Sequence, residues 1–198
     1  AVLKVINKSG TKKESNNQIT VNGADECLLI IAARTNMNWP DVEKPGPDPL
    51  PQTLNDAGKA AAGNWSGMLN AHVRDFQSLF QRCKLTLNDE SYKAVENLTV
   101  LQRLERLQSG KIDAAMVPLY FNFGRYLLIS SSRNGGMPAN LQGLWAEEYQ
   151  TPWNGDYHLD INIQMNYWPA EVTNLSSATI YTGEANGQVW RTVCTNLL

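Results

Sequence analysis

The chain has 198 residues, of which 42% are hydrophobic, and its formal net charge at pH 7 is -2. This length suffices for one ordinary core or for parts of two, and the composition is not that of a disordered chain. The small net charge gives no electrostatic basis for binding nucleic acid or an anionic membrane, and no apolar run approaches the roughly 20 residues of a membrane-spanning helix.

Residues 1–39 are predicted to be strands. Residues 1–6 form a short β-type run, the polar stretch 9–17 is interpreted as a hairpin connection, and 18–21 alternate polar and apolar side chains. The continuous apolar run at 27–33 predicts a fully buried strand. Since so few strands cannot form a stable domain alone, we expect them to be the last strands of a larger β-domain.

Residues 40–88 are predicted to be a Pro-rich and helical linker. Five prolines lie close together at positions 40, 45, 47, 49 and 51. They argue against a regular helix or a central strand, so 35–65 is interpreted as a linker or a long surface loop. From residue 66 the apolar positions recur at steps of three and four, which predicts a helix with one packed face; they are Leu69, Val73, Phe76, Phe80 and Cys83.

Two further helical stripes follow in the region 89–198. The second consists of Leu101, Leu104 and Leu107. The third runs through Ile112, Met116, Leu119, Phe123, Tyr126 and Leu127, and because Phe121 and Leu128 also lie on it, we expect it to be buried on more than one side. Core packing is the expected role of all these stripes. The three cysteines, Cys27, Cys83 and Cys194, lie far apart and match no zinc motif, so we interpret them as buried free thiols.

The segment 131–175 differs from the rest of the chain, because it combines many Asn and Gln side chains with three tryptophans and a histidine. Amides both donate and accept hydrogen bonds in fixed directions, as sugar hydroxyls require, and an indole suits the apolar face of a sugar ring. The alternative is a long loop whose amides satisfy their own backbone. The adjacent carboxylates Glu147 and Glu148 are interpreted as solvated, and core packing is expected for Trp168.

Asp160 and Asn162 stand two residues apart. In extended backbone that spacing points both side chains the same way, so the pair could hold one water molecule. Any polar strand face gives the same spacing, so the pair does not by itself identify a catalytic site.

Four stretches of this segment together resemble glycoside hydrolase family 95: 138–143 (PANLQG), 151–153 (TPW), 157–162 (YHLDIN) and 164–171 (QMNYWPAE). Weaker similarity extends upstream through 121–126, 75–80 and 21–35, so the resemblance covers nearly all of 1–175. It implies the end of an N-terminal β-sandwich domain in 1–39, a linker in 40–88, and the first helices of an incomplete (α/α)6 barrel in 89–198.

The resemblance also implies an activity, the hydrolysis of terminal α-L-fucosides, most often α-1,2-linked to galactose, with inversion and without metal or cofactor. Two asparagines of the family help to activate the attacking water, and these positions are Asp160 and Asn162, the expected catalytic residues. The expected substrate-binding residues are His158, Trp153, Asn140, Gln142 and Glu171. For Glu171 a structural hydrogen bond is an equal alternative.

Two departures from the family pattern remain. Asp160 replaces an amide by a carboxylate, which accepts hydrogen bonds but donates none when ionised. The likeness fades after Leu175, and the family's general acid and base are expected beyond residue 198.

The alternatives to a fucosidase are a noncatalytic glycan-binding or interaction module of the same fold, and an α-L-galactosidase. The expected partner is a fucosylated glycan, with self-association through exposed apolar helix faces. No secretion signal is recognisable at the N-terminus, so one is either absent or already removed, and the whole protein is expected to be secreted or periplasmic.

Overall fold

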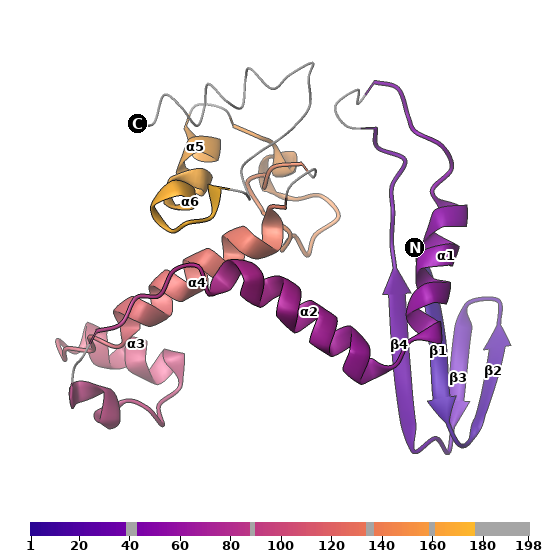
Figure 1. Ribbon diagram of the computed structural model, residues 1–198, viewed down its shortest axis with the longest axis horizontal. Coiled ribbons are helices and arrows are strands. Elements are labelled where there is room, and N and C mark those ends of the chain that lie inside the picture. Colours follow the sequence, from indigo (N-terminus) through magenta and orange to yellow (C-terminus); the bar gives the residue numbers. More distant parts are fainter. Residues whose placement is uncertain (39–42, 88–89, 134–136, 159–160, 177–198) are drawn as a thin grey trace. The chain divides into compact units, whose positions relative to one another are not determined.

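The computed structural model describes residues 1–38, 43–87, 90–133, 137–158 and 161–176. It contains two compact units, Ala1–Arg74 and the residues from Asp75 onward (Figure 1). Antiparallel strands come first and helices follow, which confirms the predicted order of elements. The finer division into 1–39, 40–88 and 89–198 stays a prediction.

Four strands form two antiparallel pairs in the first unit. Strand β1 (Val2–Lys8) pairs with β4 (Glu26–Ala32), and β2 (Thr11–Ser15) pairs with β3 (Gln18–Asn22). The interpretation of 9–17 as a mere connection is therefore wrong. The turn into β2 occupies only Ser9 and Gly10, both at positive φ, which leaves the following polar residues free to pair with β3.

Strand β4 is buried on one face only, which corrects the prediction of a fully buried strand. Ile30 is 9% exposed, whereas Leu29 and Ile31 are 60% and 75% exposed. Helix α1 packs against β1 and β4, and its Gly58 lies next to the side chain of Lys4, the cross-strand partner of Ile30. Successive side chains of a strand point to opposite faces, so the residues beside Ile30 lie on the uncovered face. Cys27 is likewise exposed, contrary to the expected buried thiol.

Helix α1 (Leu50–Ala62) occupies 13 residues of the region 35–65 that was interpreted as a linker or loop, so this interpretation is wrong for residues 50–62. The prolines do not prevent the helix because they stand at its start: Pro49 precedes the first helical residue, and Pro51 lies in the first turn. A proline there sacrifices no intrahelical hydrogen bond, since the first N–H groups of a helix have no partner within it. Pro45 and Pro47, upstream of the helix, lie outside helices and strands, and Pro40 lies outside the described residues.

The remaining elements run from Trp65 onward and form a chain of helices. They are α2 (Trp65–Phe80), η1 (Glu90–Ala94), α3 (Val100–Gln108), α4 (Met116–Ser131), η2 (Pro152–Gly155), α5 (Asn162–Tyr167) and α6 (Pro169–Val172). Within the described residues of the second unit, a hydrophobic core forms where the C-terminal ends of α2 and α4 meet α5, α6 and the loop at 137–143. It consists of Leu79, Leu128, Ile129, Ala139, Ile163, Tyr167, Ala170 and Leu175.

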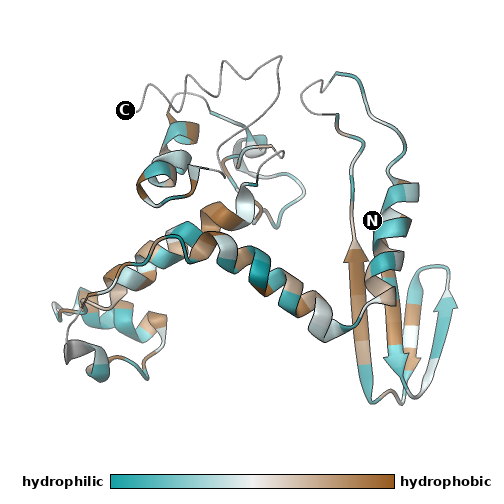
Figure 2. Cartoon of the chain, viewed as in Figure 1, coloured by the Kyte–Doolittle hydropathy of each residue, from teal (hydrophilic) through white to brown (hydrophobic). Residues whose placement is uncertain are grey.

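The three predicted helical stripes coincide with α2, α3 and α4, but much of their apolar surface is exposed. On α3 the three leucines are 37% to 66% exposed, and the buried side chain is Arg103. On α4 only the C-terminal turns enter the core, whereas Val117, Tyr120 and Phe123 are more than half exposed. In Figure 2 the hydrophobic residues of α4, drawn in brown, occur along the helix and are interrupted by more polar ones. The expected core packing of the α3 stripe is therefore wrong for this chain. The expected burial of α4 on more than one side is wrong as well.

A buried arginine joins α2 to α4. Arg125 donates from Nη1 to the carbonyl oxygens of Phe80 (2.5 Å) and Cys83 (3.0 Å) and from Nη2 to that of Leu79 (3.0 Å). Its guanidinium also lies over the Phe80 ring, 5.3 Å from the centroid. Leu79 and Phe80 are the last residues of α2, and Cys83 follows three residues later. Carbonyl groups in the last turn of a helix accept no hydrogen bond within the helix and carry partial negative charge. Burial lowers the pKa of Arg125, and the helix end supplies the compensating acceptors.

Candidate functional site

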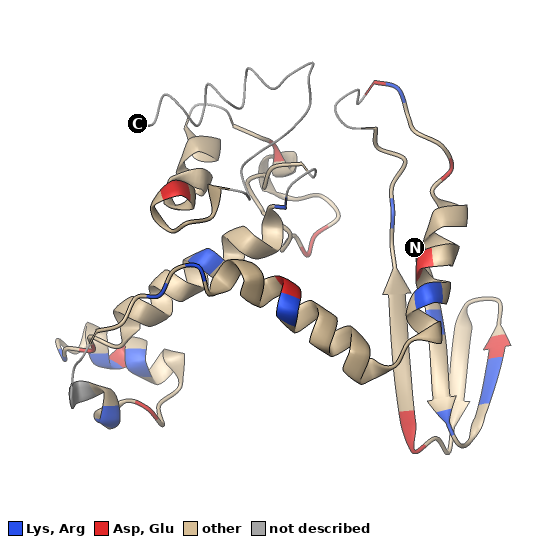
Figure 3. Ribbon diagram, in the orientation of Figure 1, with Lys and Arg blue, Asp and Glu red and all other residues tan. Residues whose placement is uncertain are grey.

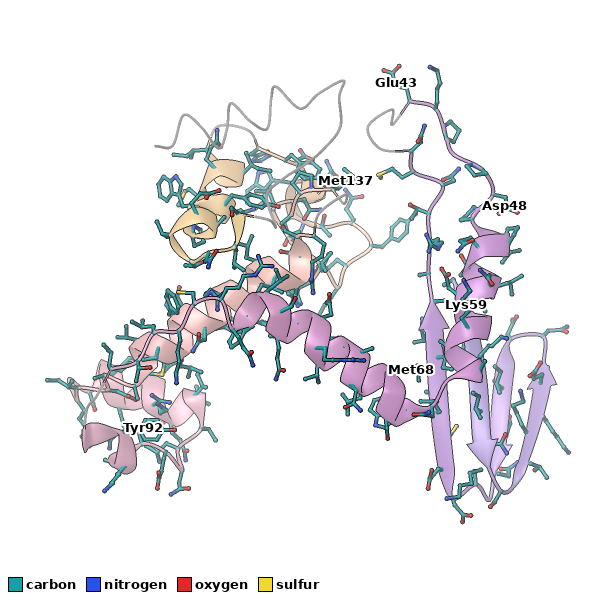
Figure 4. All side chains as sticks on the ribbon, in the orientation of Figure 1. Glu43, Asp48, Lys59, Met68, Tyr92 and Met137 are labelled. Carbon is teal, nitrogen blue, oxygen red and sulfur yellow. The ribbon has the colours of Figure 1, made fainter. Side chains whose placement is uncertain are left out.

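The polar segment after α4 begins with a tight loop at 137–143, whose first residue, Met137, is labelled in Figure 4. The side chain of Asn140 shapes this loop, because its Oδ1 accepts a hydrogen bond from the Gln142 backbone N–H at 2.8 Å. The Gly143 N–H then bonds to the Asn140 carbonyl at 3.1 Å. Such a turn is typical of asparagine, whose side chain imitates a backbone carbonyl.

A second turn, η2, contains three consecutive residues at positive φ: Trp153 (50°), Asn154 (54°) and Gly155 (62°). A left-handed tryptophan is unusual, because its Cβ approaches the following carbonyl. Glycine is favoured at the third position, because its φ is +62° and a Cβ there would lie 3.2 Å from Thr151 Oγ1 and 3.3 Å from Asn140 Nδ2. The result of this strained turn is a Trp153 side chain that is 72% exposed.

The two turns bind each other. The Leu141 N–H donates to the Asp156 carbonyl at 3.1 Å, and Gln142 Nε2 donates to the Pro152 carbonyl at 3.4 Å. Within the described residues, Asn140 Nδ2 and Gln142 Oε1 make no hydrogen bond. Each of these amides therefore uses one end to fix the loops, while its other end has no hydrogen-bond partner among the described residues.

Helix α5 lies against the first loop and carries Asn162 at its start. Asn166 Nδ2 donates to the Asn140 carbonyl at 3.4 Å, and the Ile163 N–H donates to the His158 carbonyl at 3.0 Å. Asn162 is exposed, and its side chain makes no hydrogen bond within the described ranges. The site thus gathers three segments, namely the loop at 137–143, the turn at 151–158 and the start of α5.

The charged groups around these segments are few. Helix α5 has none, α6 has only Glu171, and α4 has only the buried Arg125 (Figure 3). His158 Nε2 lies 3.7 Å from Asp156 Oδ2, and the two form an ion pair only when the imidazole is protonated. Burial raises the pKa of Tyr157, which donates from its hydroxyl to the Pro138 carbonyl at 3.1 Å. Asn140 and Gln142 contribute neutral amides, which both donate and accept hydrogen bonds.

The structure brings together most of the expected site residues. Asn140, Gln142 and Trp153 belong to the two bound turns, and His158 adjoins the start of α5. Glu171 is exposed on α6, and its carboxylate accepts no hydrogen bond within the described part of the chain. Asp160 lies outside the described residues.

Two expectations about this region are corrected. Asn162 begins a helix, so the extended backbone assumed for the Asp160 and Asn162 pair is wrong from Ile161 onward, where ψ is -2°. Trp168 is 51% exposed, so it is not a core residue here. Instead Ile163, Tyr167 and Ala170 form the buried side of α5 and α6, at helical steps of four and three.

Two tyrosines and a serine were missed. Tyr167, Tyr157 and Ser132 bind the loop at 137–143 or each other through their hydroxyls. The helical spacing of Tyr167 from Ile163 marks it as buried, but a sequence does not show which group 28 residues away its hydroxyl meets.

Groups of three or more His, Cys, Asp or Glu side chains suited to a metal ion do not occur within the described ranges. None of the helices described here is long and apolar enough to cross a membrane.

Comparison with known proteins gives this arrangement a family. Residues 64–180 match the glycosyl hydrolase family 95 catalytic domain. The chain is 39% identical over 163 residues to the probable alpha-fucosidase A of Aspergillus niger, a match that covers 79% of the chain and 20% of that relative. It is 38% identical over 173 residues to alpha-L-fucosidase 2 of Arabidopsis thaliana, covering 84% of the chain and 20% of the relative.

A third relative, the probable alpha-fucosidase A of Aspergillus oryzae, is 30% identical over 178 residues, which cover 87% of the chain and 25% of the relative. The chain therefore spans only about a fifth to a quarter of the length of these relatives. The family match includes all three segments of the site and more than half of the chain. The chain belongs to glycosyl hydrolase family 95, and its residues 64–180 are part of the family's catalytic domain.

Proposed function

We propose that the whole protein is an α-L-fucosidase that removes terminal α-1,2-linked fucose from glycans with inversion, and that this chain supplies one wall of its active site. The observation that carries the proposal is the match of residues 64–180 to the family's catalytic domain, together with relatives that are named fucosidases. The free amide ends of Asn140 and Gln142 support it, because they suit sugar hydroxyls.

The proposed mechanism needs an acid on one face of the sugar and a base-activated water on the other. Inverting glycosidases separate the two carboxyl groups by about 6.5–9.5 Å, so that the water fits between the base and the anomeric carbon. Asn162 is proposed to orient that water, since its amide stands exposed at the head of α5. Asp160 is proposed to act beside it. The acid and the base are proposed to come from the part of the domain that this chain does not include.

The sugar is proposed to lie over the two bound turns. Trp153 would contact an apolar face of the ring, because its side chain is 72% exposed and is fixed by a turn with three left-handed residues. His158 would donate to or accept from a ring hydroxyl. Glu171 is the least supported contact, since α6 shares no hydrogen bond with the turns among the described residues.

The finer architecture belongs to the same proposal. The strands β1–β4 are proposed to be the last strands of a β-sandwich domain, and the helices from α3 onward the first helices of an (α/α)6 barrel. The exposed apolar faces of α3 and α4 support this assignment, because later helices of such a barrel would cover them. A secreted or periplasmic location of the whole protein is also part of the proposal.

The test is hydrolysis by the full-length protein of three substrates: a 2'-fucosylated oligosaccharide, an aryl α-L-fucoside and an aryl α-L-galactoside. We expect the two fucosides to be cleaved with the higher kcat/KM, and Asn162→Ala to lower kcat by about 100-fold. Asn70→Ala is the control, because Asn70 is an exposed asparagine on α2 outside the site. Binding of a fucosylated glycan without turnover would favour the noncatalytic module instead, and preference for the galactoside would favour an α-L-galactosidase.

A further inference from the structure

Three consecutive residues of the site loop are each bound by a different side chain. Tyr157 Oη donates to the Pro138 carbonyl at 3.1 Å, the Ala139 N–H donates to Tyr167 Oη at 2.7 Å, and Asn166 Nδ2 donates to the Asn140 carbonyl at 3.4 Å. The backbone at 138–140 is thus bound by two side chains of α5, Asn166 and Tyr167, and by Tyr157, which precedes that helix. Of these three contacts, the one through Tyr167 is the most deeply buried.

Tyr167 also reaches the end of α4. Its hydroxyl lies 2.5 Å from Ser132 Oγ, and either oxygen could donate. Tyr167 is 6% exposed, Ala139 7% and Ser132 0%, so water does not readily replace any of the three groups. A phenol can accept two hydrogen bonds and donate one, which lets it satisfy the amide and the serine together. One hydroxyl therefore joins α4, the site loop and α5.

We infer that Tyr167 is a positioning residue for the site, in that its hydroxyl sets the loop carrying Asn140 and Gln142 against the helix that begins with Asn162. The inference rests on the proposed function, because the placement of these residues affects activity only if they contact the substrate or the attacking water. Asn140 directly follows the amide that Tyr167 binds, and Gln142 is tied to Asn140 by a 2.8 Å hydrogen bond. A displacement of Ala139 is therefore transmitted to both amides that would contact the sugar.

The hydroxyl, rather than the ring, carries this role. In Tyr167→Phe the ring would still pack with Ile163 and Ala170 in the core. The Ala139 N–H and the Ser132 hydroxyl would be buried without a partner, which is unfavourable unless the loop moves until water or another acceptor reaches them. The expected outcome is a folded protein with a misplaced loop.

The experiment compares Tyr167→Phe with wild type in the full-length protein, well below the unfolding temperature. We expect KM for an aryl α-L-fucoside to rise about tenfold, with kcat changed less, because substrate contacts are misplaced. Hydrogen exchange at the Ala139 amide should become faster, and Ser132→Ala should give a smaller shift in the same direction. Tyr149→Phe is the matched control, because Tyr149 lies in the same segment and is fully exposed.

A stability-only control separates positioning from general destabilisation. Asp113→Asn breaks a buried ion pair with Arg103 and should lower the melting temperature without changing KM. A Tyr167→Phe variant that melts earlier but keeps the wild-type KM, kcat and Ala139 exchange rate would overturn the inference. If the wild-type protein cleaves no fucoside, the proposed function fails, and the exchange rate at Ala139 decides alone: faster exchange supports the holding role of Tyr167, and unchanged exchange refutes it.

Discussion

The carboxylate of Asp113 is buried and is bound by two nitrogen atoms of Arg103, at 2.7 and 2.8 Å. The backbone amides of Ala115 and Met116, at the start of α4, also contribute to lowering the pKa of this carboxyl group. The hydrogen bond from Arg103 is the main reason that the pKa of Asp113 is lowered from its ordinary value of 3.8. One side chain therefore fastens α3 to the start of α4.

We predict that Asp113→Asn lowers the stability of the α3 region by about 3 kcal/mol at pH 7, because it leaves Arg103 charged, buried and unpaired. The pKa of Asp113 is lowered on folding, so its contribution is complete above pH 3.8 and is lost as pH falls below that value. The difference between wild type and variant should therefore shrink below pH 3.8. Hydrogen exchange of the α3 amides, compared between wild type and variant at each pH, measures this difference in stability.

The control is Asp75→Asn, which removes a solvent-exposed ion pair with Arg133 and should change stability by less than about 1 kcal/mol. Equal effects of the two substitutions would show that the Asp113 pair is no more important than a surface contact.

Among the elements, α2 and α4 are joined by the three hydrogen bonds of Arg125 to the end of α2. We predict that Arg125→Lys destabilises this junction by at least ~2 kcal/mol, because a single ammonium cannot reproduce the planar fork that reaches three carbonyls. Thermal unfolding and exchange at the end of α2 provide the measurement. Arg133→Lys, on the exposed partner of Asp75, serves as control and should be nearly silent; an Arg125→Lys variant as stable as wild type would disprove the capping role.

The elements also show how far sequence reasoning reaches. The helices at α2, α3 and α4 were predictable, because apolar steps of three and four depend only on local geometry. Helix α1 was missed, because prolines that normally break a helix here stand at its first turn. Strand β2 was missed because all five of its residues are polar or charged and exposed, so it has no apolar pattern to recognise.

At the site, the family motifs identified the segments but not the hydrogen bonds that connect them. Asn140, Gln142 and Trp153 were predicted, and the structure binds their turns to each other. The hydroxyl contacts of Tyr167 and Tyr157 were not predictable, since they join residues 19 to 35 positions apart. Periodicity likewise showed which face of α3 is apolar but not that this face would be exposed in this chain.

For the whole molecule, the exposed apolar side chains predict association of the isolated chain. Leu101 is 66% exposed, Val117 and Phe123 are 52% exposed, and Val172 is 81% exposed. Such surface favours contacts between copies. We predict oligomers by light scattering at ~10 µM, reduced by Val117→Glu together with Phe123→Glu. A monodisperse monomer with a cooperative melt would contradict the assignment of these faces to the interior of a larger domain.

The isolated chain is also predicted not to hydrolyse an aryl α-L-fucoside. Loss of either the acid or the base of a glycosidase typically lowers the rate by a factor of about 10² to 10⁴. Efficient turnover by the purified chain, abolished by Asp160→Ala, would show that the catalytic groups lie within it.

The central proposal for the whole protein is that this family 95 segment belongs to an inverting fucosidase. The anomer of fucose that is released first tests it most directly. Proton NMR of the full-length protein acting on a 2'-fucosylated oligosaccharide resolves the two anomers before they interconvert. Inversion predicts that β-L-fucose appears first from the α-linked substrate, with the signal lost in Asn162→Ala. Release of α-L-fucose first, or no release of fucose at all, would contradict the account.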